Sequence, residues 1–126
     1  MAVALVVEDE WLVRMEITEA LDAHGWTILE ASTGEAALAM LDHNPRIDLV
    51  VTDVRLPGPA SGWDVADAFR AADAKIAVIY CSGNACDPSR QAPDSVFLTK
   101  PCRIDRLLEA TLKLCPAGAT LEKRAE

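Results

Sequence analysis

The sequence predicts a single α/β domain built on a doubly wound, five-stranded parallel sheet. Short apolar segments of strand length alternate with longer segments whose apolar residues recur at helical spacing. This alternation is typical of parallel strands joined by right-handed crossovers, with helices on both faces of the sheet. With 126 residues, of which 51% are hydrophobic and 25% charged, the chain is long and apolar enough to form one core.

The N-terminal half contains the first three predicted strands. Residues 2–7 form a continuous apolar run that ends in acids, as in a strand buried on both faces. A helix is predicted over 11–24, where apolar residues recur at helical spacing before the stop at Gly25. Residues 27–31 and 47–52 are the second and third strands.

The second helix is predicted to begin with a capping box. In the segment Ser32-Thr-Gly-Glu35, the Ser32 hydroxyl and the Glu35 carboxylate have the spacing of that motif. The helix that follows is rich in Ala and Leu, and we expect it to end near residues 43–45.

The C-terminal half continues the alternation. A third helix carries Val65 and Phe69, and residues 75–81 and 95–99 are the fourth and fifth strands. The last helix, closed by Pro116, has the clearest apolar stripe, formed by Ile104, Leu107, Leu108, Thr111, Leu112 and Cys115. We expect residues 1–116 to form the domain and residues 117–126 to be a frayed tail or the start of a linker.

Composition argues against several function classes. Twenty acidic and twelve basic residues give a net charge of −8, which disfavours binding to nucleic acid or to an anionic membrane surface. The N-terminal apolar run is too short for a signal peptide or a membrane span. The four cysteines show neither zinc-ligand spacing nor a disulfide framework. We therefore expect a cytoplasmic protein with free thiols.

Polar residues stand where the predicted strands end. Glu8 and Asp9 follow the first strand, Asp53 the third, Ser82 the fourth, and Lys100 the fifth. In an open α/β sheet, ligands bind at this carboxyl edge. Three carboxylates that meet there repel one another unless a cation joins them, and oxygen ligands suit Mg²⁺, with Mn²⁺ a close substitute.

Four motifs in this order resemble the receiver domain of two-component response regulators, over residues 2–115. They are V-V-E-D-E at 6–10, D-L-V-V-T-D-V-R-L-P-G at 48–58, C-S-G at 81–83 and L-T-K-P at 98–101. Each motif is short, but all four stand at the ends of the appropriate strands. The resemblance implies a flavodoxin-like sheet with strand order 2-1-3-4-5.

The resemblance also implies roles for the polar residues. Asp53 would be the phosphoacceptor, attacking the phosphoryl group of a phosphohistidine donor. Glu8 and Asp9 would hold Mg²⁺ together with Asp53 and the backbone carbonyl of Arg55. In addition, Lys100 and Ser82 would contact the phosphoryl oxygens.

Two further residues match switching positions of the family. Phe97 matches the aromatic residue that moves between inward and outward positions on activation, although packing alone also explains an aromatic residue in a strand. Pro101 would follow a cis peptide bond that directs Lys100 to the site. The sequence departs from the family pattern in Glu8, where Asp is commoner, in a longer loop over 57–62, and in Cys102, where Phe is usual.

The connection between the fourth and fifth strands is predicted to contain a single helical turn or no helix. Only twelve residues, 83–94, separate Ser82 from the fifth strand. Pro88 suits a first helical position, but Pro93 lacks an N–H and clashes one turn back, so a helix can run only over 88–92. We expect a mobile loop beside the site and a remodelled switching surface.

The predicted function is that of a bacterial phosphorelay receiver, a signalling switch and not a metabolic enzyme. Its partners would be a histidine kinase or a phosphotransfer protein, and an unknown downstream protein. The sequence leaves open whether the chain acts alone or belongs to a larger regulator. One alternative is a phosphorylation-independent interaction module. The other is a Mg²⁺-dependent phosphatase with an aspartyl nucleophile, which would need a second acid where Arg55 stands.

Overall fold

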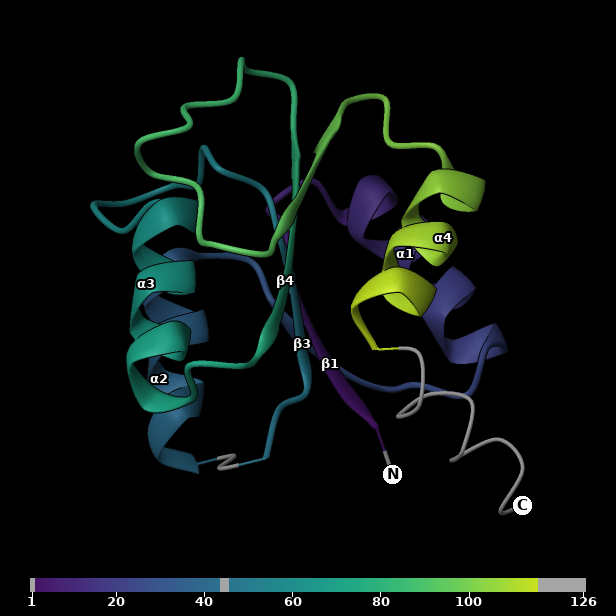
Figure 1. The fold of residues 1–126 in the computed structure, drawn as a ribbon, viewed down its shortest axis with the longest axis horizontal. Coiled ribbons are helices and arrows are strands. Elements are labelled where there is room, and N and C mark those ends of the chain that lie inside the picture. Colours follow the sequence, from purple (N-terminus) through teal and green to yellow (C-terminus); the bar gives the residue numbers. More distant parts are fainter. Residues whose placement is uncertain (1, 44–45, 116–126) are drawn as a thin grey trace.

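The computed structural model describes residues 2–43 and 46–115, which form a three-layer α/β domain (Figure 1). All five strands are parallel, in the order β2-β1-β3-β4-β5. This confirms the predicted fold class and strand order. The strands are β1 (Val3–Val7), β2 (Thr27–Ala31), β3 (Leu49–Thr52), β4 (Ala77–Ser82) and β5 (Val96–Thr99).

In the described part of the chain, two helices lie on each face of the sheet. Helices α2 and α3 cover one face, and helices α1 and α4 cover the other (Figure 1). The helices are α1 (Trp11–Ala23), α2 (Gly34–His43), α3 (Gly62–Ala72) and α4 (Ile104–Leu114). Where both ends of a predicted helix or strand lie in the described residues, the observed ends differ from the predicted ends by at most two residues.

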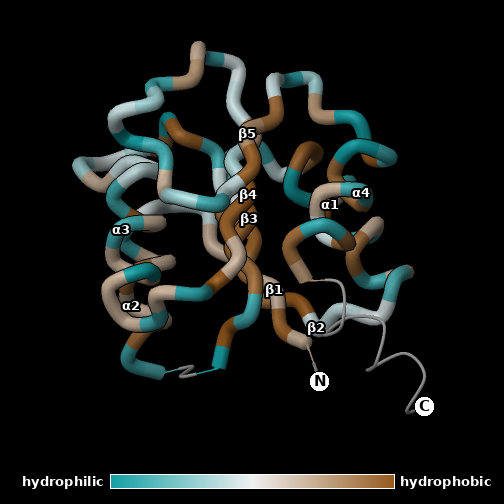
Figure 2. The backbone as a smooth tube through the Cα atoms, in the orientation of Figure 1, coloured by the Kyte–Doolittle hydropathy of each residue, from teal (hydrophilic) through white to brown (hydrophobic). Residues whose placement is uncertain are grey.

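The core consists of two apolar clusters, one on each face of the sheet. Successive strand residues alternate between them: Leu5 packs toward α2 and α3, whereas Ala4 and Val6 pack toward α1 and α4. Every residue of β3 and of β4 is buried. The central strands are therefore continuously apolar, as Figure 2 shows in brown.

The predicted capping box of the second helix is wrong. The hydroxyl of Thr33, one residue after Ser32, accepts a hydrogen bond of 3.0 Å from the Ala36 N–H. The Glu35 carboxylate does not close the motif and instead accepts the Ala60 N–H at 2.9 Å. The predicted capping box depended on the Glu35 side chain, but this side chain binds a backbone N–H outside the helix instead.

The connection between β4 and β5, residues 83–95, contains no helix. One of its turns lies over 88–90, where the N–H groups of Arg90 and Gln91 donate to the Asp87 carbonyl at 3.0 and 3.1 Å. The Asp87 carboxylate accepts the Ser89 N–H at 3.0 Å. The prediction of a single turn or no helix is confirmed, so the label α4 belongs to the last helix of the chain.

Polar contacts attach the β4–β5 connection to α3 and β4. The buried Ala92 N–H donates to the Tyr80 hydroxyl at 3.1 Å. Arg70 of α3 donates to the Pro93 carbonyl at 2.7 Å. Arg90 bridges two exposed carboxylates of α3, at 3.2 Å from that of Asp64 and 3.1 Å from that of Asp67. These contacts lie in the second half of the connection, and its mobility stays a prediction.

Helix α4 buries a narrower stripe than its sequence pattern predicted. Leu107, Ala110 and Thr111 are buried, but Leu112 is 55% exposed. Ala110 and Leu112 lie on opposite sides of the stripe, so the buried face of the helix is rotated toward Ala110 and away from Leu112. Among the described residues, no helix has both the length and the apolar composition to cross a bilayer. Pro116 and the predicted tail over 117–126 lie outside the described residues.

Candidate functional site at the carboxyl edge of the sheet

Three acidic side chains meet beyond the ends of β1 and β3. These strands are neighbours, and the backbone N–H of Asp53 donates to the Val7 carbonyl at 3.0 Å. Carboxylate oxygens of Glu8, Asp9 and Asp53 all lie within 4.8 Å of one another. The convergence expected from the strand ends is therefore present. The oxygen-only donor set fits a hard divalent cation.

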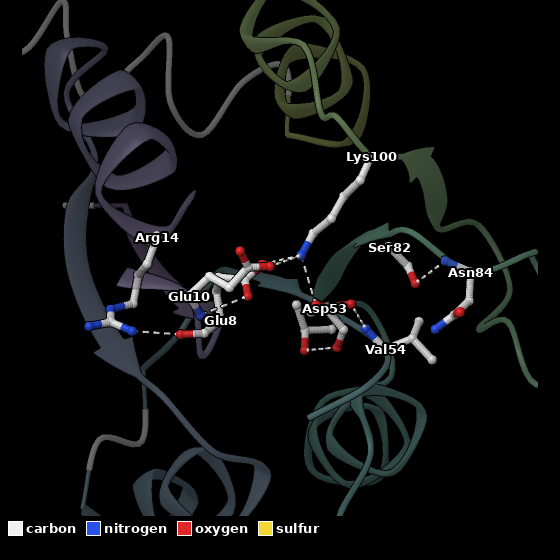
Figure 3. Close-up of polar contacts among 9 residues, drawn as sticks. Glu8, Glu10, Arg14, Asp53, Val54, Ser82, Asn84 and Lys100 are labelled. Atoms are coloured by element: carbon white, nitrogen blue, oxygen red, sulfur yellow. Dashed lines mark hydrogen bonds and ion pairs between the residues drawn. The ribbon is translucent and has the colours of Figure 1, made fainter. Parts of the chain in front are cut away.

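Lys100 lies between two of these carboxylates (Figure 3). Its Nζ is 2.7 Å from Glu8 Oε1 and 2.8 Å from Asp53 Oδ2. The bond between Lys100 and Pro101 is cis, in agreement with the resemblance. Burial alone would lower the pKa of Lys100, but hydrogen bonds and the charges of Asp53 and Glu8 outweigh it and hold that pKa above its ordinary value. The side chain is therefore a fixed cation.

Glu8 is the most buried acid of the site, at 1% exposure. Burial raises its pKa and the charge of Asp53 adds to the shift, whereas the hydrogen bonds from Lys100 and from the Glu10 N–H oppose it. One ammonium thus faces three clustered carboxylates, and the cluster keeps an excess of negative charge that favours a divalent cation.

The Asp53 carboxylate is buried but lies beside an open pocket. Its Oδ1 accepts the Val54 N–H at 2.6 Å, and its Oδ2 accepts from Lys100 (Figure 3). The pocket, about 450 Å³ in volume, is also lined by Arg55 and Gly83. A small group can therefore approach Asp53 from solvent.

Gly62, at the start of α3, contacts the backbone of Asp53 directly. Its N–H donates to the Val54 carbonyl at 2.7 Å, and a Cβ atom here would overlap the Asp53 carbonyl oxygen. The absence of a side chain lets α3 begin against the site. Ser61 then caps the helix in a capping box with Asp64.

Ser82 and Phe97 also lie where the sequence indicated. Ser82 is the last residue of β4, fully buried, and its Oγ accepts the Asn84 N–H at 3.1 Å (Figure 3). Phe97 is half-buried on β5, and its ring centroid lies 6.0 Å from that of Trp63 and 6.1 Å from that of Tyr80. Phe97 therefore packs in an aromatic cluster with Trp63 and Tyr80, and the sequence did not indicate this cluster.

Two residues that contact the acidic cluster, Glu10 and Arg14, were missed from the sequence. Glu10 lies 3.7 Å from the Lys100 ammonium. Arg14 donates to the Glu8 carbonyl at 2.6 Å (Figure 3). It also donates to the Glu30 carboxylate at 2.9 Å. The spacing of four residues between Glu10 and Arg14 could have indicated that both lie on one side of a helix. The sequence could not indicate that the Glu8 carbonyl would point toward Arg14.

Fold and site together define a class of protein, and comparisons with known proteins agree. The model of the response regulator receiver domain matches residues 4–112. The chain belongs to this family. It is 35% identical to the sensor kinase CckA of Brucella abortus, over 84% of this chain and 12% of that protein. It therefore spans a small part of that relative.

Solved structures show the same fold. A response regulator receiver protein from Sinorhizobium medicae superposes with a TM-score of 0.87 and 33% identity, covering 92% of this chain and 95% of the other. The response regulator TrrA from Thermotoga maritima, solved in complex with Mg²⁺ and BeF, gives a TM-score of 0.79 at 32% identity. This match covers 90% of this chain and 99% of that one.

Proposed function

We propose that the chain receives a phosphoryl group on Asp53 with Mg²⁺ bound beside it, and that it signals through protein–protein contacts. One observation carries the proposal. The Asp53 carboxylate lies between a fixed cation, Lys100, and two further acids, at the wall of an open pocket. A loose phosphoryl-transfer transition state needs positioning and charge neutralisation, and this arrangement offers both.

The proposed transfer forms an aspartyl phosphate. An oxygen of Asp53 attacks the phosphorus of a phosphohistidine, the P–N bond breaks, and the imidazole leaves. Lys100 and the Val54 N–H both hydrogen-bond Asp53, and they would neutralise charge on the phosphoryl oxygens. Ser82 would donate to one of these oxygens, and Phe97 would change its packing in response.

Mg²⁺ would be held by Glu8, Asp9, Asp53 and the backbone carbonyl of Arg55, with Mn²⁺ as a substitute. Support comes from the shared oxygen cluster and from TrrA, whose structure was solved with Mg²⁺ and BeF. When bound, the ion offsets the charge that phosphorylation adds to an acidic site.

The proposed phosphodonor is a histidine kinase or a histidine phosphotransfer protein. CckA, a relative, is a sensor kinase. A downstream protein target would read the phosphorylated domain, for which we propose the bounds 1–116. We propose a switch whose only reaction beyond its own phosphorylation is slow loss of the phosphoryl group.

Intact-mass measurement with acetyl phosphate tests the proposal. We expect the wild-type chain to gain one phosphoryl group with Mg²⁺ or Mn²⁺ and none in a chelator. Asp53→Ala should abolish the gain, whereas Asp42→Asn, an exposed acid of α2, should preserve it.

Phosphorylation of Asp53→Ala would contradict the assignment. A correctly folded wild-type chain that gains no mass would support the phosphorylation-independent interaction module. Turnover of a generic phosphomonoester would support the phosphatase.

A further inference from the structure

Two cysteines adjoin the residues proposed to contact the phosphoryl group. Cys81 directly precedes Ser82 at the end of β4, and Cys102 stands two residues after Lys100 on the segment that leads to α4. The Lys100 N–H donates to the Ser82 carbonyl at 2.8 Å, so the two segments are already joined beside the thiols.

The two thiols lie on the same side of the sheet. Cys81 is two residues after Ile79, so its side chain points to the face covered by α1 and α4. Cys102 packs against the apolar cluster of that face. The two thiols lie near enough that each is the main influence on the pKa of the other. A covalent bond between them would therefore need only local movement.

The environments of the two thiols differ in a way that suits an attacking and a resolving cysteine. Cys81 is 1% exposed, whereas Cys102 is partly exposed. The neighbouring Cys81 lowers the pKa of Cys102, a shift that burial opposes and the charge of Lys100 assists. The neighbouring Cys102 and burial raise the pKa of Cys81. Thiolate character and solvent access thus coincide at Cys102.

We propose that Cys81 and Cys102 form an oxidation site, at which a peroxide closes a disulfide bond beside the phosphorylation site. The Cys102 thiolate attacks one peroxide oxygen, the O–O bond breaks, hydroxide leaves, and a sulfenic acid forms. The sulfur of Cys81 then attacks the sulfenic sulfur. The S–O bond breaks, water leaves with the thiol proton, and the disulfide forms. Two thiols lose two electrons, which reduce the peroxide.

The bond would act on phosphorylation through the residues next to it. A disulfide holds its two sulfurs about 2.0 Å apart, closer than any non-bonded contact, so closing it would draw the segment after Lys100 and the end of β4 together. The Lys100 ammonium, held at 2.8 Å from Asp53, would shift with its backbone. This second part rests on the proposed function, because it assigns Lys100 a role in phosphoryl transfer.

Peroxide treatment of the full chain, followed by alkylation and peptide mapping, tests the oxidation site. We expect a Cys81–Cys102 cross-link within one chain, reversed by dithiothreitol and lost in Cys102→Ser. Cys86→Ser and Cys115→Ser are the matched controls and should keep it. Cys81→Ala, checked by its melting curve, should stop the reaction at an oxidised Cys102. A cross-link through Cys86 or Cys115, a dimer, or no cross-link would overturn the assignment.

Phosphorylation from acetyl phosphate with Mg²⁺, compared between reduced and oxidised chains, tests the effect. The oxidised chain should react at least about threefold more slowly and recover with dithiothreitol, since small displacements of a positioning group reduce transfer rates. Peroxide should not change the phosphorylation rate of the Cys102→Ser variant, because this variant cannot form the disulfide. An unchanged rate in the cross-linked chain would overturn the effect. A reduced chain that gains no phosphoryl group would instead contradict the proposed function, and the mapping would still decide the disulfide.

Discussion

Helix α4 and the β4–β5 connection each follow a strand that ends at the site, and they cover the sheet in different ways. Helix α4 packs an apolar stripe, with Leu107 fully buried, against the face that it shares with α1. The β4–β5 connection covers part of the opposite face as a coil, in which Ala92 joins the apolar cluster and polar contacts to α3 and β4 supply the remaining attachments. A face of this sheet can therefore be covered without a helix when the backbone polar groups find partners.

The difference originates in composition and in proline placement. Residues 104–114 repeat apolar side chains at helical spacing and contain no proline, whereas Pro88 and Pro93 limit any helix in the connection to one turn. Stability should thus come from apolar burial in one segment and from individual hydrogen bonds in the other.

The largest contrast should appear on truncating α4. Leu107→Ala removes a fully buried side chain and should lower the free energy of unfolding by about 2–5 kcal/mol. Leu112→Ala, on the same helix but 55% exposed, is the matched control and should change it by about 0.5 kcal/mol or less. Denaturant unfolding measures both. Equal losses would contradict the exposure of Leu112 and would support the apolar stripe that the sequence pattern predicted.

Hydrogen exchange compares the two segments directly. Amides over 83–94 should exchange at least about a hundredfold faster than those of α4, because none of them belongs to a helix. The Ala92 amide, bonded to the Tyr80 hydroxyl, should be the slow exception. Slow exchange over two or more helical turns of the connection would contradict the coil.

Tyr80→Phe sharpens the comparison at a single hydrogen bond. The change leaves the buried Ala92 N–H without its acceptor and should cost about 1–3 kcal/mol, with faster exchange at Ala92. Thermal and denaturant unfolding measure the loss. Arg90→Ala removes only exposed ion pairs and should have a smaller effect. If Arg90→Ala proves the more damaging, the connection depends on surface charge.

A smaller effect is expected at Glu8. Its carboxylate is buried in the site, whereas the charged side chains of the connection are exposed. Burial raises the pKa of Glu8, so its charged form destabilises the fold at neutral pH, and this cost disappears as the pH falls through that pKa. Without divalent ions, Glu8→Gln should therefore raise the melting temperature at pH 7, and the gain should vanish in acid. Mg²⁺ should stabilise the wild type more than the variant. A lower melting temperature for the variant at pH 7 would contradict the sign.

The sequence was a good guide wherever an outcome depended on strand order. Glu8, Asp53 and Lys100 meet because the carboxyl ends of parallel strands share one edge. The parallel sheet was readable from the alternation of elements, and the strand order from the resemblance to receiver domains. Contacts between distant segments were not readable. Glu35 caps no helix because it bonds a backbone N–H 25 residues away, and the Tyr80 hydroxyl meets Ala92 only through the path of a coil. Side-chain partners of this kind depend on tertiary structure and leave no local pattern.

The most direct test of the central claim is localisation of the phosphoryl group by tandem mass spectrometry. The wild-type chain would be treated with acetyl phosphate and Mg²⁺, then digested under conditions that preserve acyl phosphates. We expect a single modified residue, Asp53. A phosphoryl group on any other residue, or one that forms equally well in a chelator, would contradict it.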